Sequence, residues 1–292
     1  MERNYAVSLH FDGDIARDHQ LSMRTLGKTL SHLQNAVDRA CLEINYGALW
    51  KHTRMPQRLW PEAELIIGPS FEGGYILDFF LRNQSTREVL ERVKSAIKSA
   101  FEKMTEEGVE RTRTIAEQVT QNREQIRSDL VKPISYKELV HTNDPKTIRT
   151  YGDRAIVREI DMILSIIRSS AAGESSFELT LAVERPMKYS FTKSTAVAFH
   201  EAVSKREMGL PVIYTAKIRS LDRISKSAKI IHTDFDRQAN LFFATEETLL
   251  ELIPFFEENE EIVFYGAPWI EYGAFDPTSG DILFIAMPSS LR

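Results

Sequence analysis

The spacing of apolar residues changes partway along this chain, and that change constrains the fold more than any other feature. Before residue 171, most apolar side chains recur every three or four positions, which is the period of an amphipathic helix. After the small and polar residues 171–176, short apolar runs are separated by turn-forming residues, as in strands. The sequence therefore predicts an α+β protein with a linker at 171–176.

Residues 1–85 are predicted to form an N-terminal α+β unit made of a strand, a helix and a hairpin. Residues 5–11 alternate like a half-buried strand, and residues 23–44 carry an apolar stripe at helical spacing. Asp18 is placed to cap this helix, because its carboxylate can accept the unpaired N–H groups of a first turn. Residues 63–67 and 75–81 predict two strands joined by a turn rich in glycine.

Residues 86–172 are predicted to form a helical segment, and residues 173–292 a β-rich C-terminal domain. Within the helical segment, residues 115–130 carry only a narrow apolar stripe, which suits a projecting arm or an oligomer contact. In the last range, several short strands with a helix among them predict a small barrel or sandwich.

Composition narrows the class of protein. The chain has 292 residues, a net charge of −5 and no basic block, which argues against direct nucleic-acid binding. Its single cysteine, Cys41, excludes an internal disulfide. No apolar run reaches the roughly 18 residues of a membrane span, and residues 1–10 do not resemble a signal peptide. We therefore expect a cytoplasmic protein.

Three motifs that would indicate catalysis are incomplete in this sequence. The glycine-containing turn at 68–74 lacks the Lys-Ser/Thr ending of a phosphate loop, and Glu72 stands where a nucleophile elbow requires glycine. His200 and Glu201 begin like a zinc-protease helix, but Ser204 occupies the position of the second histidine. We therefore predict no catalytic residue, no metal ligand and no cofactor.

An acidic cluster near the N-terminus keeps one enzymatic alternative open. Hard divalent cations prefer oxygen ligands, so carboxylates beside an imidazole could form a metal-dependent hydrolase site. The spacing does not match a calcium loop, and a turn followed by a helix cap explains the same residues. The cluster comprises Asp12, Asp14, Asp18 and His19.

Exposed aromatic residues are the best candidates for partner contacts. Aromatic rings separated by glycine and proline in residues 265–273 suit an interaction surface, although the same rings could pack inside a barrel. Alternatively, Trp269 and Tyr272 could stack nucleic-acid bases on a barrel surface. Glutamates within residues 246–261 form an acidic face that could attract a basic protein surface. The predicted partner-binding residues are Phe71, Tyr265, Trp269 and Tyr272.

Residues 8–13 (Ser-Leu-His-Phe-Asp-Gly) leading into the helix at 23–44, together with the order of parts, resemble uncharacterised proteins of phages and bacterial mobile elements. Among named families, the overall length and layout resemble the phage-encoded Gabija anti-defence family. This resemblance implies a non-enzymatic inhibitor that forms homo-oligomers in the host cytoplasm. It also implies a partner, a host nuclease–helicase defence complex whose access to DNA the inhibitor blocks.

Overall fold

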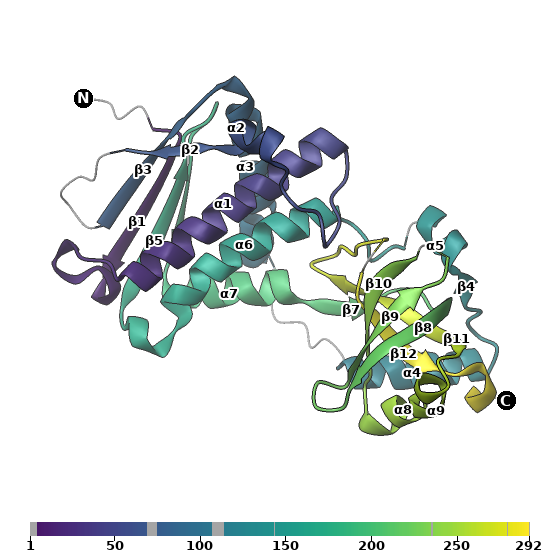
Figure 1. The fold of residues 1–292 in the computed structure, drawn as a ribbon. Helices are drawn as coiled ribbons and strands as arrows, with labels where there is room; N and C mark the ends of the chain where they lie inside the picture. The colour runs from purple at the N-terminus through teal and green to yellow at the C-terminus, as the bar shows by residue number, and fades with distance from the viewer. Residues whose placement is uncertain are drawn as a thin grey trace. The chain divides into compact units, whose positions relative to one another are not determined.

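The computed structural model describes residues 5–68, 75–106, 114–142, 144–234, 236–278 and 280–291. Helices make up 46% and strands 28% of the structure, which confirms the predicted α+β class. The chain forms two compact units, and each of them is assembled from separate stretches of sequence (Figure 1). Unit 1 comprises Met1–Leu49, Thr53–Gly108 and Gly152–Lys205, and unit 2 comprises Trp50–His52, Val109–Tyr151 and Arg206–Arg292.

Unit 1 is built on a five-stranded antiparallel sheet with the order β2-β3-β1-β5-β6. Alternate residues of β1 are buried, which is the pattern of a strand with one face on a core. The predicted N-terminal strand and hairpin are therefore present, and two later strands extend the same sheet. The strands are β1 (Val7–Gly13), β2 (Leu65–Ile67), β3 (Tyr75–Leu81), β5 (Ser175–Leu181) and β6 (Met187–Phe191).

Helices pack against one face of this sheet (Figure 1). Phenylalanine rings fill the contact, with centroids 4.8 Å apart for Phe11 and Phe177 and 5.6 Å apart for Phe191 and Phe199. The main helices are α1 (Met23–Tyr46), α3 (Gln84–Glu106), α6 (Tyr151–Arg168) and α7 (Lys193–Ser204), with short turns at η1 (Asp14–His19), η2 (Gln57–Leu59), α2 (Trp60–Ala63) and η3 (Ser170–Ala172).

The helix predicted at 23–44 is present as α1, but its cap is different from the predicted one. The Ser22 side chain accepts a hydrogen bond from the Thr25 backbone N–H at 3.1 Å. Asp18 lies earlier, inside η1, with a left-handed backbone (φ 55°) that cannot be the entry to α1. A serine closer to the first turn satisfies the free N–H group, so the aspartate is not needed there.

Unit 2 contains a closed five-stranded barrel, which confirms the predicted barrel and excludes the sandwich. Four strands take the Greek-key order β11-β8-β9-β10, and β12 closes the circle between β10 and β11. The β10–β12 pair is parallel, whereas the other barrel pairs are antiparallel. The barrel strands are β8 (Val212–Asp222), β9 (Ser227–His232), β10 (Arg237–Phe242), β11 (Glu261–Glu271) and β12 (Ile282–Ala286), and the short strands β4 (Ile134–Ser135) and β7 (Arg206–Met208) flank them.

The helices of unit 2 pack on this barrel. The narrow apolar stripe that predicted a projecting arm belongs to α4, and Val119 of this stripe is buried in a cluster with Leu283 and Ile285 of β12. The stripe of α4 therefore covers its own barrel. Within the described residues, no helix combines the length and apolar character that a bilayer crossing requires. The helices are α4 (Ile115–Arg127), α5 (Tyr136–His141), α8 (Glu246–Leu250) and α9 (Ile253–Glu257).

The two units divide the chain differently from the predicted ranges 1–85, 86–172 and 173–292. Helix α3, from the predicted helical segment, packs with α1 and α7 inside unit 1. Strands β5 and β6, from the predicted β-rich domain, join the N-terminal sheet because β5 pairs with β1 from Val7 to Gly13. Hydrophobic period identifies strands but not their pairing partners. Because β5 and β6 belong to the sheet of unit 1, the residues predicted as a linker, 171–176, lie inside unit 1.

Candidate functional site

The aromatic segment at 265–273 runs along β11 and into the turn that follows it. Tyr272 is fully buried, with the Arg149 guanidinium 4.4 Å above its ring, so it presents no surface to a partner in this conformation. Trp269 is half-buried; its ring meets Phe242 edge-on at 4.9 Å and lies 5.0 Å from the Arg206 guanidinium. These two rings mostly pack within unit 2.

Tyr265 has exposed apolar neighbours, which lie on the outward face of the β8–β11 pair. Thr215 lies opposite Val263, and Ile213 lies opposite Tyr265. Val263 is 44% exposed and Ile213 is 38% exposed. We call these four residues the β8–β11 face. It points outward because the alternate residues of both strands, Tyr214, Ala216, Ile262 and Phe264, are buried in the barrel. The other predicted contact residue, Phe71, lies outside the described residues.

Acidic side chains are concentrated in residues 246–261, the segment that leads into β11. Helix α9 packs against β8, and the chain passes from α9 directly into β11. Leu250 and Phe256 are exposed apolar residues in this stretch. Among the described residues, no basic side chain pairs with Glu257, Glu258 or Glu260. The exposed glutamates of the stretch are Glu247, Glu251, Glu257, Glu258, Glu260 and Glu261.

A hollow that is partly open to solvent is lined by residues of α5 and of all five barrel strands. Tyr136, Tyr214 and His232 form its aromatic wall, with the Tyr136 and His232 rings 4.3 Å apart. Burial raises the pKa of Tyr136 to about 12. The two carboxylates of the wall already hold one lysine: Asp276 accepts from the Lys51 backbone N–H at 2.7 Å, and Asp281 accepts from Lys51 Nζ. Internal bonds therefore occupy both carboxylates of this hollow.

The acidic cluster at residues 12–19 is built into the connection between β1 and α1. Asp14 accepts hydrogen bonds from the Glu174 backbone N–H at 3.1 Å and from Arg17 Nη2 at 2.8 Å. These bonds, the Glu174 one first, lower the pKa of Asp14. The Asp14 carboxylate is therefore already engaged by groups of its own chain. Across the described ranges, no group of three histidine, cysteine or acidic side chains is placed to hold a metal ion.

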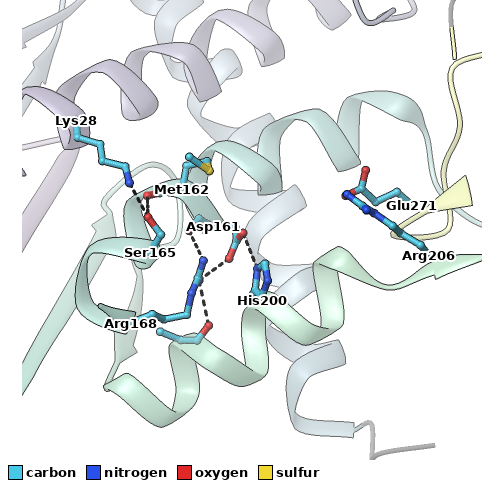
Figure 2. A network of polar contacts seen from close by, with 9 residues as sticks. Lys28, Asp161, Met162, Ser165, Arg168, His200, Arg206 and Glu271 are labelled. Carbon is cyan, nitrogen blue, oxygen red and sulfur yellow. Dashed lines mark hydrogen bonds and ion pairs between the residues drawn. The ribbon is translucent and has the colours of Figure 1, made fainter. Parts of the chain in front are cut away.

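His200 belongs to a polar network between α6 and α7 (Figure 2). Its Nδ1 lies 2.9 Å from Asp161 Oδ2, and Arg168 donates to Asp161 Oδ1 at 2.5 Å. Arg168 also reaches the Ala196 carbonyl of α7 at 3.3 Å. Asp161 is buried and Arg168 is half-buried, so this network ties two helices of unit 1 together.

Sequence reasoning missed a second surface with exposed aromatic residues, which lies in unit 1. Trp60 is 55% exposed and Tyr46 is 42% exposed, and Arg58 Nη2 donates to the Tyr46 hydroxyl at 3.1 Å. Arg54 is exposed in the same loop. A local charge count could have found it, because residues 47–61 contain three basic residues and two tryptophans but no acidic residue. The acidic total for the chain concealed this segment.

Comparison with known proteins gives no identification. No protein-family model, no curated protein and no solved structure matches this chain.

Proposed function

We propose that this chain is a non-enzymatic protein-binding protein that contacts a basic partner through the β8–β11 face and the glutamates beside it. The observation that carries the proposal is the combination of exposed Val263 and Ile213 with glutamates that no basic side chain of the described residues pairs with. Apolar residues at the centre of a patch supply affinity, and surrounding charges steer a complementary partner.

The backbone of the β8–β11 face is held in a defined position by strand pairing. Ile213, Thr215, Val263 and Tyr265 are held by cross-strand register, so docking a partner would cost little backbone entropy. Tyr265 also contacts the buried cluster under α4, which limits the motion of its ring. A rigid tyrosine beside two branched apolar residues is typical of a small interface anchor.

The resemblance to the Gabija anti-defence family adds a specific partner to this proposal. A nuclease–helicase assembly needs a basic surface to hold DNA phosphates, and an acidic face such as that of Glu257, Glu258 and Glu260 would compete for that surface. In the same proposal the inhibitor forms homo-oligomers around its target. A stable monomer in light scattering, both free and with the target, would contradict the oligomer.

The test is binding to the purified Gabija nuclease–helicase assembly, followed by the rate of DNA cleavage. We expect the wild-type chain to bind and to slow cleavage. Val263→Ser and Ile213→Ser should weaken binding through lost apolar contact, each by about 1 kcal/mol or more. Glu257→Lys with Glu258→Lys should slow association most strongly at low salt.

Leu130→Ser is the matched control, because Leu130 is an exposed apolar residue of unit 2 outside the β8–β11 face. It should leave binding unchanged. If the wild-type chain does not bind the assembly, the anti-defence function is refuted. If it binds and the β8–β11 variants bind equally well, the function stands but this surface is the wrong one.

A further inference from the structure

Unit 1 has an exposed surface of aromatic and basic residues that plays no part in the proposed function. We define the α1–α2 surface as Tyr46, Arg54, Arg58 and Trp60. Tyr46 is the last residue of α1, Trp60 is the first residue of α2, and the hydrogen bond from Arg58 to the Tyr46 hydroxyl brings the two segments together. Exposed tryptophan and tyrosine beside arginine need a reason, because burial would normally stabilise such rings.

The backbone beneath this surface is held in place. Arg39 Nη1 donates to the Thr53 carbonyl at 3.2 Å, and Leu59 is buried. The Leu59 backbone N–H also donates to the Pro56 carbonyl at 3.0 Å. The two arginines are therefore displayed from a segment with an ordered backbone, and the two rings from the adjoining ends of α1 and α2, which lowers the entropic cost of binding.

The arginines of this surface lack the acidic partners found elsewhere in unit 1. Arg82 pairs with Glu64, and Arg92 pairs with Glu43 at 2.8 Å. By contrast, no carboxylate within the described parts of the chain pairs with Arg54 or Arg58. The nearest acid in sequence, Glu62, accepts a hydrogen bond from Asn45 at 3.0 Å. Two uncompensated guanidinium groups on an acidic protein favour an anionic ligand.

We propose that the α1–α2 surface binds single-stranded nucleic acid. The planar guanidinium groups of Arg54 and Arg58 match phosphate oxygens, and the rings of Tyr46 and Trp60 give unpaired bases a face on which to stack. A duplex hides its base faces, so it would offer this surface phosphates alone. This surface belongs to unit 1, whereas the proposed protein-binding face belongs to unit 2.

The experiment titrates the 292-residue chain into a short fluorescein-labelled oligothymidylate at several salt concentrations and follows anisotropy. Two phosphate contacts predict that log Kd rises with log salt with a slope of about 1.4, at about 0.7 per contact with a single strand. Arg58→Gln should reduce the slope by about 0.7. Trp60→Ala should weaken binding by about 5- to 150-fold, the equivalent of about 1–3 kcal/mol for one stacked base.

The control variant combines Arg219→Gln with Lys229→Gln, which removes two exposed cations from the barrel instead. It has the same net charge as Arg54→Gln with Arg58→Gln. We expect the barrel variant to bind like the wild type and the α1–α2 variant to lose the salt-dependent part of binding. Circular dichroism checks that every variant is folded.

Three outcomes would overturn the proposal. The first is no binding of the oligonucleotide by the wild-type chain, which would leave the surface to a protein partner. The second is an equal loss in the two charge variants, which would indicate general electrostatic attraction. The third is unchanged affinity for the Trp60→Ala variant, because stacking would then make no contribution.

Discussion

Two helical glycines of unit 1 should respond to alanine with opposite signs. Gly27 lies within α1, and a Cβ added there would meet no atom within 4 Å. Gly152 lies in the first turn of α6, and a Cβ there would come within 2.1 Å of the Glu43 side chain. That carboxylate is not free to move aside, because it accepts hydrogen bonds from Arg92 at 2.9 Å.

The expected magnitudes follow from these two environments. Alanine favours a helix over glycine by about 0.5–1 kcal/mol, so Gly27→Ala should raise the free energy of unfolding by that amount. At Gly152 the same gain is opposed by overpacking, which costs about 1–3 kcal/mol, and by disturbance of the Arg92 pairs with Glu43 and Asp153. We expect Gly152→Ala to be destabilising by about 1–2 kcal/mol overall.

Urea unfolding followed by far-ultraviolet circular dichroism measures both changes. A double-mutant cycle with Glu43→Ala isolates the contact, because Gly152→Ala should become much less harmful once the Glu43 side chain is removed. If Gly152→Ala is as stabilising as Gly27→Ala, or if its cost is the same without the Glu43 side chain, the close packing of α1 against α6 is not as described.

Three further predictions concern buried polar groups. Burial, then the charges of Glu62 and Asp38, raises the pKa of Cys41 to about 11, so a thiol reagent should label Cys41 only after unfolding; fast labelling of the native protein would contradict this. Burial lowers the pKa of His232 from 6.5, so the unfolded chain binds the proton more readily. The free energy of unfolding should therefore be unaffected by His232 above about pH 6.5 and should fall as the pH drops below that value. In a plot of urea midpoint against pH, His232→Phe should flatten the decline below about pH 6.5. Asp161→Ala leaves the Arg168 guanidinium without its carboxylate and should cost about 3–5 kcal/mol in urea unfolding, and a loss below about 1 kcal/mol would disprove the structural role of this network.

Hydrophobic period predicted the elements of this fold better than their assembly. It identified α1 and the barrel strands because each has a long run at one period or a clear alternation. It could not show that β5 pairs with β1, because pairing between distant strands depends on register and leaves no local pattern. The narrow stripe of α4 was compatible with an arm, and only the structure shows it lying on β12.

For the candidate contact residues, the sequence likewise predicted the aromatic residues but not which of them are exposed. An aromatic pattern does not distinguish a ring that packs inward from one that faces out, and a strand alternates between the two. Tyr265 faces outward on β11 beside Val263, whereas the strand has ended before Tyr272, whose left-handed backbone (φ 56°) turns its ring into the protein. Exposure at Trp60 followed from a short helix that no periodicity could predict.

Strand order also determines when each unit can be completed during synthesis. His10 on β1 and Glu178 on β5 are neighbours in the sheet but are 168 residues apart in the chain. The barrel likewise closes on β12, the last of its five strands to leave the ribosome, and all five residues of β12 are buried. At about 5–20 residues per second, the nascent chain would expose an unclosed barrel edge for seconds. Until β12 arrives, such an edge is free to pair with strands of other chains.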